Sequence, residues 1–150
     1  MQNFNKKAFT MIELVFVIVV LGILAAVAIP RLAATRTDAE ISKGRSDVAS
    51  IRSAIITERQ SRLITGDSTY ILPTTLNTGG LFGGVLTYAI TAGSGAGHWS
   101  NTAADVNTST YNYNVAGFDI PFTYTRSTGK FTCPDGNTTQ EQKYCGSLTH

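Results

Sequence analysis

Lys6-Lys7-Ala8-Phe9-Thr10-Met11-Ile12-Glu13 opens an apolar run that continues from Leu14 to Ile29 and ends at Pro30-Arg31. From residue 9 to residue 29 the run has 21 residues and is interrupted only by Thr10 and Glu13, so a helix of this length can span a bilayer. A carboxylate in such a helix costs roughly 2.5–3.5 kcal/mol on insertion scales. Glu13 is therefore a candidate functional residue.

Charge and length limit the classes of function that this chain can have. The chain has 150 residues, of which the part beyond the apolar run is enough for one small domain, and the formal net charge is only +2. The excess charge belongs to Lys6 and Lys7, because the remaining chain has ten basic and ten acidic side chains. A balanced chain argues against any mechanism that needs a polycationic face for nucleic acid and leaves only weak, local contacts open.

Two lysines before an apolar run also fit a secretory signal peptide. Ala26-Val27-Ala28 matches the A-x-A pattern of signal peptidase, which would release a protein that begins at Ile29. Glu13 argues against this interpretation, because an ordinary signal sequence gains nothing from an acid in its apolar region.

The stretch from Lys6 to Leu14 resembles the class III signal of type IV pilins and type II secretion pseudopilins, and the resemblance covers roughly residues 6 to 32. It implies that prepilin peptidase cuts between Ala8 and Phe9 on the cytoplasmic side, after the basic leader residues Lys6 and Lys7. It also implies N-methylation of Phe9. Ala8 departs from the family, in which glycine usually precedes the cut.

The resemblance also assigns assembly roles to Glu13, Gly22 and Pro30. Glu13 would pair with the free amine of Phe9 on a neighbouring subunit, which would neutralise a carboxylate that is costly in a packed helical core. Alternatively, Glu13 reaches the cytoplasmic headgroups from near the helix end. Gly22 and Pro30 weaken a helix, so this region would kink or melt on assembly, or Pro30 would simply kink the helix at the membrane exit.

The orientation in the membrane rests on conflicting signals. Basic residues are more numerous after the span than before it, which taken alone places the C-terminal part in the cytoplasm. Lysines directly before a short N-terminal span usually stay inside, and the resemblance and the cysteine pair favour the opposite side. We therefore expect a single-pass protein of the inner membrane with its C-terminal domain in the periplasm.

Residues 31–63 continue the helical pattern. They contain no further proline, and small or apolar residues recur at steps of three and four on one stripe: Ile41, Gly44, Val48, Ile51 and Ile55. The other faces carry Asp38, Glu40, Lys43, Asp47, Arg52, Glu58, Arg59 and Arg62. We expect the stripe to pack on a sheet and the charges to form a solvated or inter-subunit face.

After Leu63 the composition changes to Thr, Ser, Asn and Gly. Residues 111–115, 120–125 and 130–133 have strand composition, residues 126–129 form a hairpin turn, and residues 81–91 fit either a strand or a short helix. The predicted fold is α+β and pilin-like: a long N-terminal helix, transmembrane in its first half, packed on a small antiparallel sheet. The predicted segments are a leader (1–8), an assembly helix (9–30), its amphipathic continuation (31–63) and a β-rich headgroup (64–150).

Cys133 and Cys145 have no further Cys or His at zinc spacing, so they indicate a disulfide in an oxidising compartment. Asp135-Gly136-Asn137 weakly resembles a calcium loop, but the third acidic position is Thr139 and only Glu141 follows. No motif of a nucleophile, a metal pair or a phosphate loop occurs. We expect no catalytic residue, no metal and no cofactor, and hence no enzyme.

Two sites match the acceptor N-x-[ST] for glycosylation, Asn107 and Asn137. Each follows an aspartate by two residues, Asp105 and Asp135, which resembles the acidic acceptor sequence of certain bacterial oligosaccharyltransferases. Such matches also arise by chance in a domain rich in threonine and asparagine.

The sequence thus favours a structural subunit of a type IV pilus, a type II secretion filament or a DNA-uptake filament, polymerised through its N-terminal helix. The implied partners are other pilin-like subunits in a homo- or hetero-oligomer, prepilin peptidase, an inner-membrane platform with its ATPase, and the membrane itself. The alternative is a secreted or membrane-tethered binding protein in which residues 9–29 serve only as signal or anchor.

Overall fold

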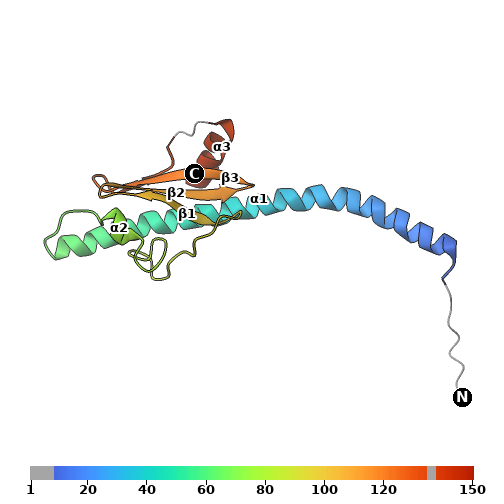
Figure 1. The fold of residues 1–150 in the computed structure, drawn as a ribbon, viewed down its shortest axis with the longest axis horizontal. Helices are drawn as coiled ribbons and strands as arrows, with labels where there is room; N and C mark the ends of the chain where they lie inside the picture. The colour runs from blue at the N-terminus through green and yellow to red at the C-terminus, as the bar shows by residue number, and fades with distance from the viewer. Residues whose placement is uncertain (1–8, 135–137) are drawn as a thin grey trace, which may run out of the picture. The chain divides into compact units, whose positions relative to one another are not determined.

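A computed structural model describes residues 9–134 and 138–150, apart from the side chains of residues 33 and 34. Its elements are the helices α1 (Met11–Ile64), α2 (Pro73–Leu76) and α3 (Thr139–Thr149) and the strands β1 (Trp99–Ala104), β2 (Thr108–Val115), β3 (Phe118–Thr125) and β4 (Lys130–Thr132) (Figure 1). The chain divides into two compact units, an N-terminal unit that ends at Arg36 and a C-terminal unit, Thr37–His150.

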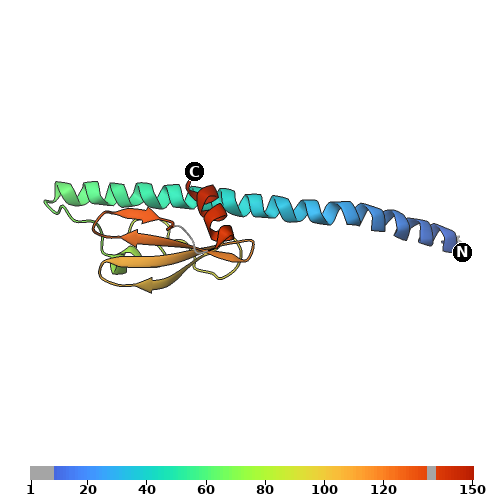
Figure 2. The ribbon, with the colours of Figure 1, turned by 90° about the horizontal axis from the view of Figure 1, so that it is seen from above.

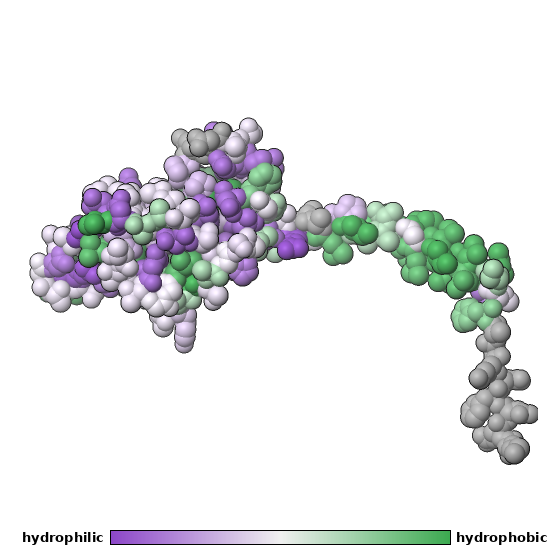
Figure 3. All heavy atoms as spheres, viewed as in Figure 1, coloured by the Kyte–Doolittle hydropathy of each residue, from purple (hydrophilic) through white to green (hydrophobic). Residues whose placement is uncertain are grey.

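The N-terminal unit consists of the first part of α1. Its large apolar side chains between Phe9 and Leu32 are exposed, and Figure 3 shows them gathered along this part of the helix. By length and composition, α1 is the one helix among the described residues that could cross a membrane. The helix continues through Pro30, which lies inside its bounds.

The C-terminal unit contains an antiparallel sheet in the order β1-β2-β3-β4. Alternation of side chains along β2 places Ser109, Tyr111, Tyr113 and Val115 on its buried face, as expected for a sheet with one covered face. A turn at Ala116 and Gly117, both with positive φ, joins β2 to β3. The sheet therefore grows by consecutive hairpins.

The second part of α1 covers the buried face of the sheet. Val48, Ile51 and Ile55 of the predicted stripe are buried in one core with the aromatic residues of β2, β3 and β4. Gly44 lies where a side chain would meet the ring of Tyr113 and the Cδ2 atom of Leu148, at 2.6 Å from the latter. The absence of a side chain at this glycine lets strand β2 and helix α3 approach α1.

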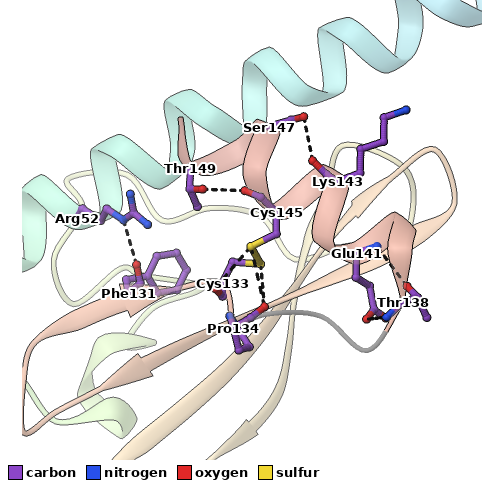
Figure 4. Close-up of a disulfide and its surroundings, with 10 residues drawn as sticks. All are labelled: Arg52, Phe131, Cys133, Pro134, Thr138, Glu141, Lys143, Cys145, Ser147 and Thr149. Carbon is purple, nitrogen blue, oxygen red and sulfur yellow. Dashed lines mark hydrogen bonds between the residues drawn. A yellow bond between two sulfur atoms is a disulfide. The ribbon is translucent and has the colours of Figure 1, made fainter.

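Helix α3 lies beside the sheet and crosses α1 (Figure 2). It begins with a capping box in which the Thr138 hydroxyl accepts a hydrogen bond from Glu141 N and the Glu141 carboxylate accepts one from Thr138 N. A disulfide joins Cys133, just after β4, to Cys145 on α3, with their Cα atoms 5.9 Å apart (Figure 4). The predicted disulfide is confirmed.

The predicted α+β class is also confirmed, with differences in detail. Relative to the predicted strands, β2 begins three residues earlier, β3 begins two residues earlier and β4 ends one residue earlier. The turn at residues 126–129 is observed. β1 and α3 were not predicted. Residues 81–91 form turns with an isolated bridge between Leu81 and Ile90, so neither predicted alternative is right.

Candidate assembly segment and its anchoring residues

Glu13 is held by a second capping box at the start of α1. Its carboxylate Oε2 accepts hydrogen bonds from Thr10 N at 2.9 Å and from the Thr10 hydroxyl at 2.7 Å, while Glu13 N donates to that hydroxyl at 3.3 Å. This arrangement satisfies donors that the first turn of a helix otherwise leaves without partners. The sequence signal for it, T-x-x-E, was present at residues 10–13, but Thr10 was not among the predicted site residues.

The other predicted residues of this segment have few contacts within the chain. Phe9 is 81% exposed, and a Cβ atom added at Gly22 would meet no atom within 4 Å. Pro30 lies inside the helix, whereas Lys6, Lys7 and Ala8 fall outside the described residues. The segment thus presents apolar side chains with a single acid near its start.

Several charged residues of α1 hold the C-terminal unit together, and for these the prediction of a solvated face is wrong. Glu40 is buried, and its Oε2 accepts a hydrogen bond from Ala116 N at 2.9 Å, which anchors the β2–β3 turn. Asp47 Oδ2 accepts a hydrogen bond from Trp99 Nε1 at 3.0 Å. The hydrogen-bond partners of these acids lie far away in the sequence, so helical periodicity does not predict that the acids face the sheet.

Arg52 has a similar role on the opposite edge of the sheet. Its Nε donates to the Phe131 carbonyl oxygen at 3.0 Å, so the side chain bonds to the backbone of β4 (Figure 4). Arg62, in contrast, forms ion pairs with Glu58 at 3.0 Å and with Asp67 at 3.4 Å, as expected for a solvated helix surface.

Three buried tyrosines add polar anchors to the core. The hydroxyls of Tyr111, Tyr113 and Tyr124 donate to Asn77 Oδ1, Glu40 O and Ile71 O at 2.9, 2.7 and 2.9 Å. Burial raises the pKa of all three phenols, to about 12 for Tyr124, and the charges of Asp47 and Glu40 raise that of Tyr113 further. The tyrosines are structural donors.

Asn107 is exposed between β1 and β2, and its backbone N donates to Asp105 Oδ1 at 2.6 Å. Hydrogen bonds from the backbone amides of Asn107 and Thr108 lower the pKa of the Asp105 carboxyl. Ser109, the third position of the acceptor sequence, is buried, and its hydroxyl donates to Ala103 O at 3.2 Å. Glycosylation of Asn107 stays a prediction.

Asn137 and the residues of the weak calcium pattern, Asp135 and Gly136, lie outside the described residues. Glu141, the one further acid of that pattern, caps α3 through its carboxylate. Within residues 9–134 and 138–150, no group of three His, Cys, Asp or Glu side chains could hold a metal ion.

The first part of α1 is an exposed apolar helix with one acid in its first turn, and the second part packs on a small antiparallel sheet. This is the arrangement of a pilin-like protein. The comparisons with known proteins agree. Residues 3–29 match the family model described as the prokaryotic N-terminal methylation motif.

Three curated relatives are type II secretion system core protein G from different bacteria. The chain is 36% identical over 54 residues to the protein of Pectobacterium carotovorum and 36% identical over 55 residues to that of Aeromonas hydrophila. It is 34% identical over 55 residues to the protein of Pseudomonas aeruginosa. Each match covers 36–37% of this chain and 35–39% of the relative.

The chain therefore matches just over a third of each relative's length, and no solved structure matches it significantly. Together, the methylation motif and these relatives support the pilin and pseudopilin family that the residues from Lys6 to Leu14 indicate.

Proposed function

We propose that this chain is a structural subunit of a filament of the type II secretion or type IV pilus class, processed by prepilin peptidase and polymerised through its N-terminal helix. The observation that carries the proposal is the exposed apolar surface between Phe9 and Leu32, most of which lies within the matched methylation motif, residues 3–29. A single subunit cannot bury this surface by itself. A bilayer covers it before assembly, and neighbouring helices cover it afterwards.

Cleavage between Ala8 and Phe9 creates the partner that Glu13 needs in such a filament. It exposes the α-amino group of Phe9, four positions before Glu13, and methylation leaves that group cationic. Inside an apolar helical core, a carboxylate paired with this cation is far less costly than an isolated one. Glu13 would then exchange its bonds to Thr10 for a pairing that fixes the axial position of one subunit relative to the next.

The remaining roles follow from the same model. Gly22 and Pro30 weaken the helix where it must adapt during assembly. The membrane-bound precursor is single-pass, with the C-terminal unit in the periplasm, where Cys133 and Cys145 can be oxidised. Other pilin-like subunits, prepilin peptidase and an inner-membrane platform with its ATPase are the partners.

The first test is the N-terminus of the chain isolated from membranes of an expressing bacterium. Mass spectrometry should find a chain that begins with methylated Phe9. A chain that begins at Met1 or Ile29 would contradict the proposal and would favour the alternative, a tethered or secreted binding protein.

The capping box gives that alternative one supporting observation, because it explains Glu13 without any neighbour. The variants Glu13→Gln and Thr10→Ala separate the two explanations. In the proposed filament, Glu13→Gln removes the charge and should abolish assembly with normal cleavage, whereas Thr10→Ala removes only the cap and should leave assembly largely intact. If Thr10→Ala prevents assembly as strongly as Glu13→Gln does, charge pairing is not the role of Glu13.

A further inference from the structure

A polar pocket of about 410 Å³ lies in the C-terminal unit, far in sequence from the methylation motif. Its lining is rich in hydroxyl and guanidinium groups: Arg59, Ser68, Thr69, Tyr70, Asn107, Arg126 and Ser127. We call it the arginine pocket. Arg59 comes from α1 and Arg126 from the β3–β4 turn, so the fold brings together two cations that the sequence separates by 67 positions.

Both arginines of the pocket lack an acidic partner within 4 Å among the residues that the structure describes. The acids within two positions of a lining residue, Glu58, Asp67 and Asp105, are already engaged. Glu58 pairs with Arg62 at 3.0 Å. Asp67 binds Arg62 and accepts a hydrogen bond from Thr69 N at 2.9 Å, and Asp105 accepts hydrogen bonds from the Asn107 and Thr108 amides. The lining therefore carries two guanidinium groups and no carboxylate, which favours an anion over a cation or a neutral ligand.

Arg59 is also held in place before any ligand arrives. Its guanidinium lies over the Tyr70 ring, 4.2 Å from the centroid, and its Nη1 donates to the Tyr70 hydroxyl at 2.6 Å. The Tyr70 ring in turn lies against Gly129, where a side chain would collide with it. Arg126 Nε donates to the Tyr70 carbonyl oxygen at 3.4 Å. One residue, Tyr70, thus orients both cations.

A second observation points to a missing ligand. Arg59 Nε is buried and has no hydrogen-bond partner, and it is the one such side-chain atom found in the described part of the chain. Buried donors are normally satisfied, so this exception calls for an explanation, and an anion bound in the pocket would supply one. Guanidinium groups and hydroxyls are the donors that tetrahedral oxyanions prefer.

We propose that the arginine pocket binds a small oxyanion, a phosphate or sulfate group, either free or carried by a small molecule such as a phosphorylated sugar. Arg59 and Arg126 supply the charge, and the hydroxyls of Ser68, Thr69 and Ser127 supply neutral donors at the rim. None of the lining residues belongs to the N-terminal unit, so the pocket does not use the proposed assembly helix.

The test uses the full chain in a neutral detergent, titrated with inorganic phosphate and, separately, with glucose 1-phosphate. Ionic strength is kept constant with chloride. The midpoint of thermal unfolding, followed by Trp99 fluorescence, should rise and saturate with ligand, because a ligand that binds only the folded state stabilises it. Tighter binding of the sugar phosphate identifies a carried group, and equal binding identifies the free ion.

Arg59→Gln and Arg126→Gln should each raise the dissociation constant about tenfold or more. Lys130→Gln is the matched control: Lys130 is exposed on neighbouring β4 and does not line the pocket, so the effect there should stay below about twofold. The unfolding midpoint of each variant without ligand shows whether it folds. Two results would overturn the proposal: no saturable response of the native chain to either compound, or an equal response in all three variants.

Discussion

Gly44→Ala should destabilise the C-terminal unit even though alanine is the better helix former. Helix propensity alone would stabilise the protein by about 0.8–1 kcal/mol. At this position, however, the new methyl group would collide with the Tyr113 ring and lie 2.6 Å from Leu148 Cδ2. Overpacking of this kind costs about 1–3 kcal/mol. The Tyr113 ring cannot easily move, because its hydroxyl donates to Glu40 O at 2.7 Å.

We therefore expect a net loss of up to about 2 kcal/mol in the free energy of unfolding. Urea unfolding of the full chain in detergent measures it, with the fluorescence of Trp99 as the signal. Trp99 is the single tryptophan of the chain and is fully buried, so it reports on the C-terminal unit and not on the membrane helix.

Gly146→Ala is the matched control, since Gly146 lies in α3 and a Cβ atom added there meets no atom within 4 Å. This variant should gain up to about 1 kcal/mol. If Gly44→Ala were as stabilising as Gly146→Ala, the close approach of β2 and α3 to α1 at Gly44 would be refuted.

Three further predictions concern the C-terminal unit. Cys145→Ser removes the disulfide between Cys133 and Cys145, which are 12 positions apart. Urea unfolding should show a free energy of unfolding lower by up to about 3 kcal/mol, and an unchanged midpoint would contradict this. Glu40→Ala removes the carboxylate that accepts the hydrogen bond from Ala116 N and should lower the free energy of unfolding by about 1.5–3 kcal/mol. Glu40→Gln keeps an acceptor and should lower it by less. Equal losses in the two variants would exclude this hydrogen bond as the cause. Burial raises the pKa of Tyr124 to about 12 in the folded chain, against about 10 in the unfolded chain. The neutral phenol therefore stabilises the fold fully below pH 10, and this stabilisation falls by about 1.36 kcal/mol per pH unit up to pH 12. Urea unfolding between pH 9 and 11 should show a shallower loss of stability in Tyr124→Phe than in the native chain.

The sequence predicts those elements whose side chains alternate with the period of the structure. In β2, four consecutive inward positions are buried, and the stripe of α1 recurs at steps of three and four. In β1, in contrast, Trp99 alone is buried, and the remaining residues are polar or are alanines. The composition of β1 alone does not predict a strand, because the segment becomes one through its pairing with β2.

Helix α3 was not predicted, although the sequence contains a signal for the residue at which it begins. It buries one apolar residue, Leu148, so periodicity is weak, but Thr138 and Glu141 have the spacing of a capping box. The same spacing at Thr10 and Glu13 would have predicted the hydrogen bonds at the start of α1. Glu40 and Asp47 could not be placed from sequence, because their partners lie about 50 to 80 positions away.

The bond from Arg52 to the Phe131 carbonyl oxygen bears on self-association. Phe131 belongs to an edge strand, and an open edge is a template on which another chain can add a strand. Arg52 occupies that acceptor, while on the other edge the register of β1 shifts between Asn101 and Ala103, which interrupts a flat edge. Both features would hinder the pairing of a sheet edge with the edge of a second copy, which matters for a subunit that packs closely with others in the proposed filament.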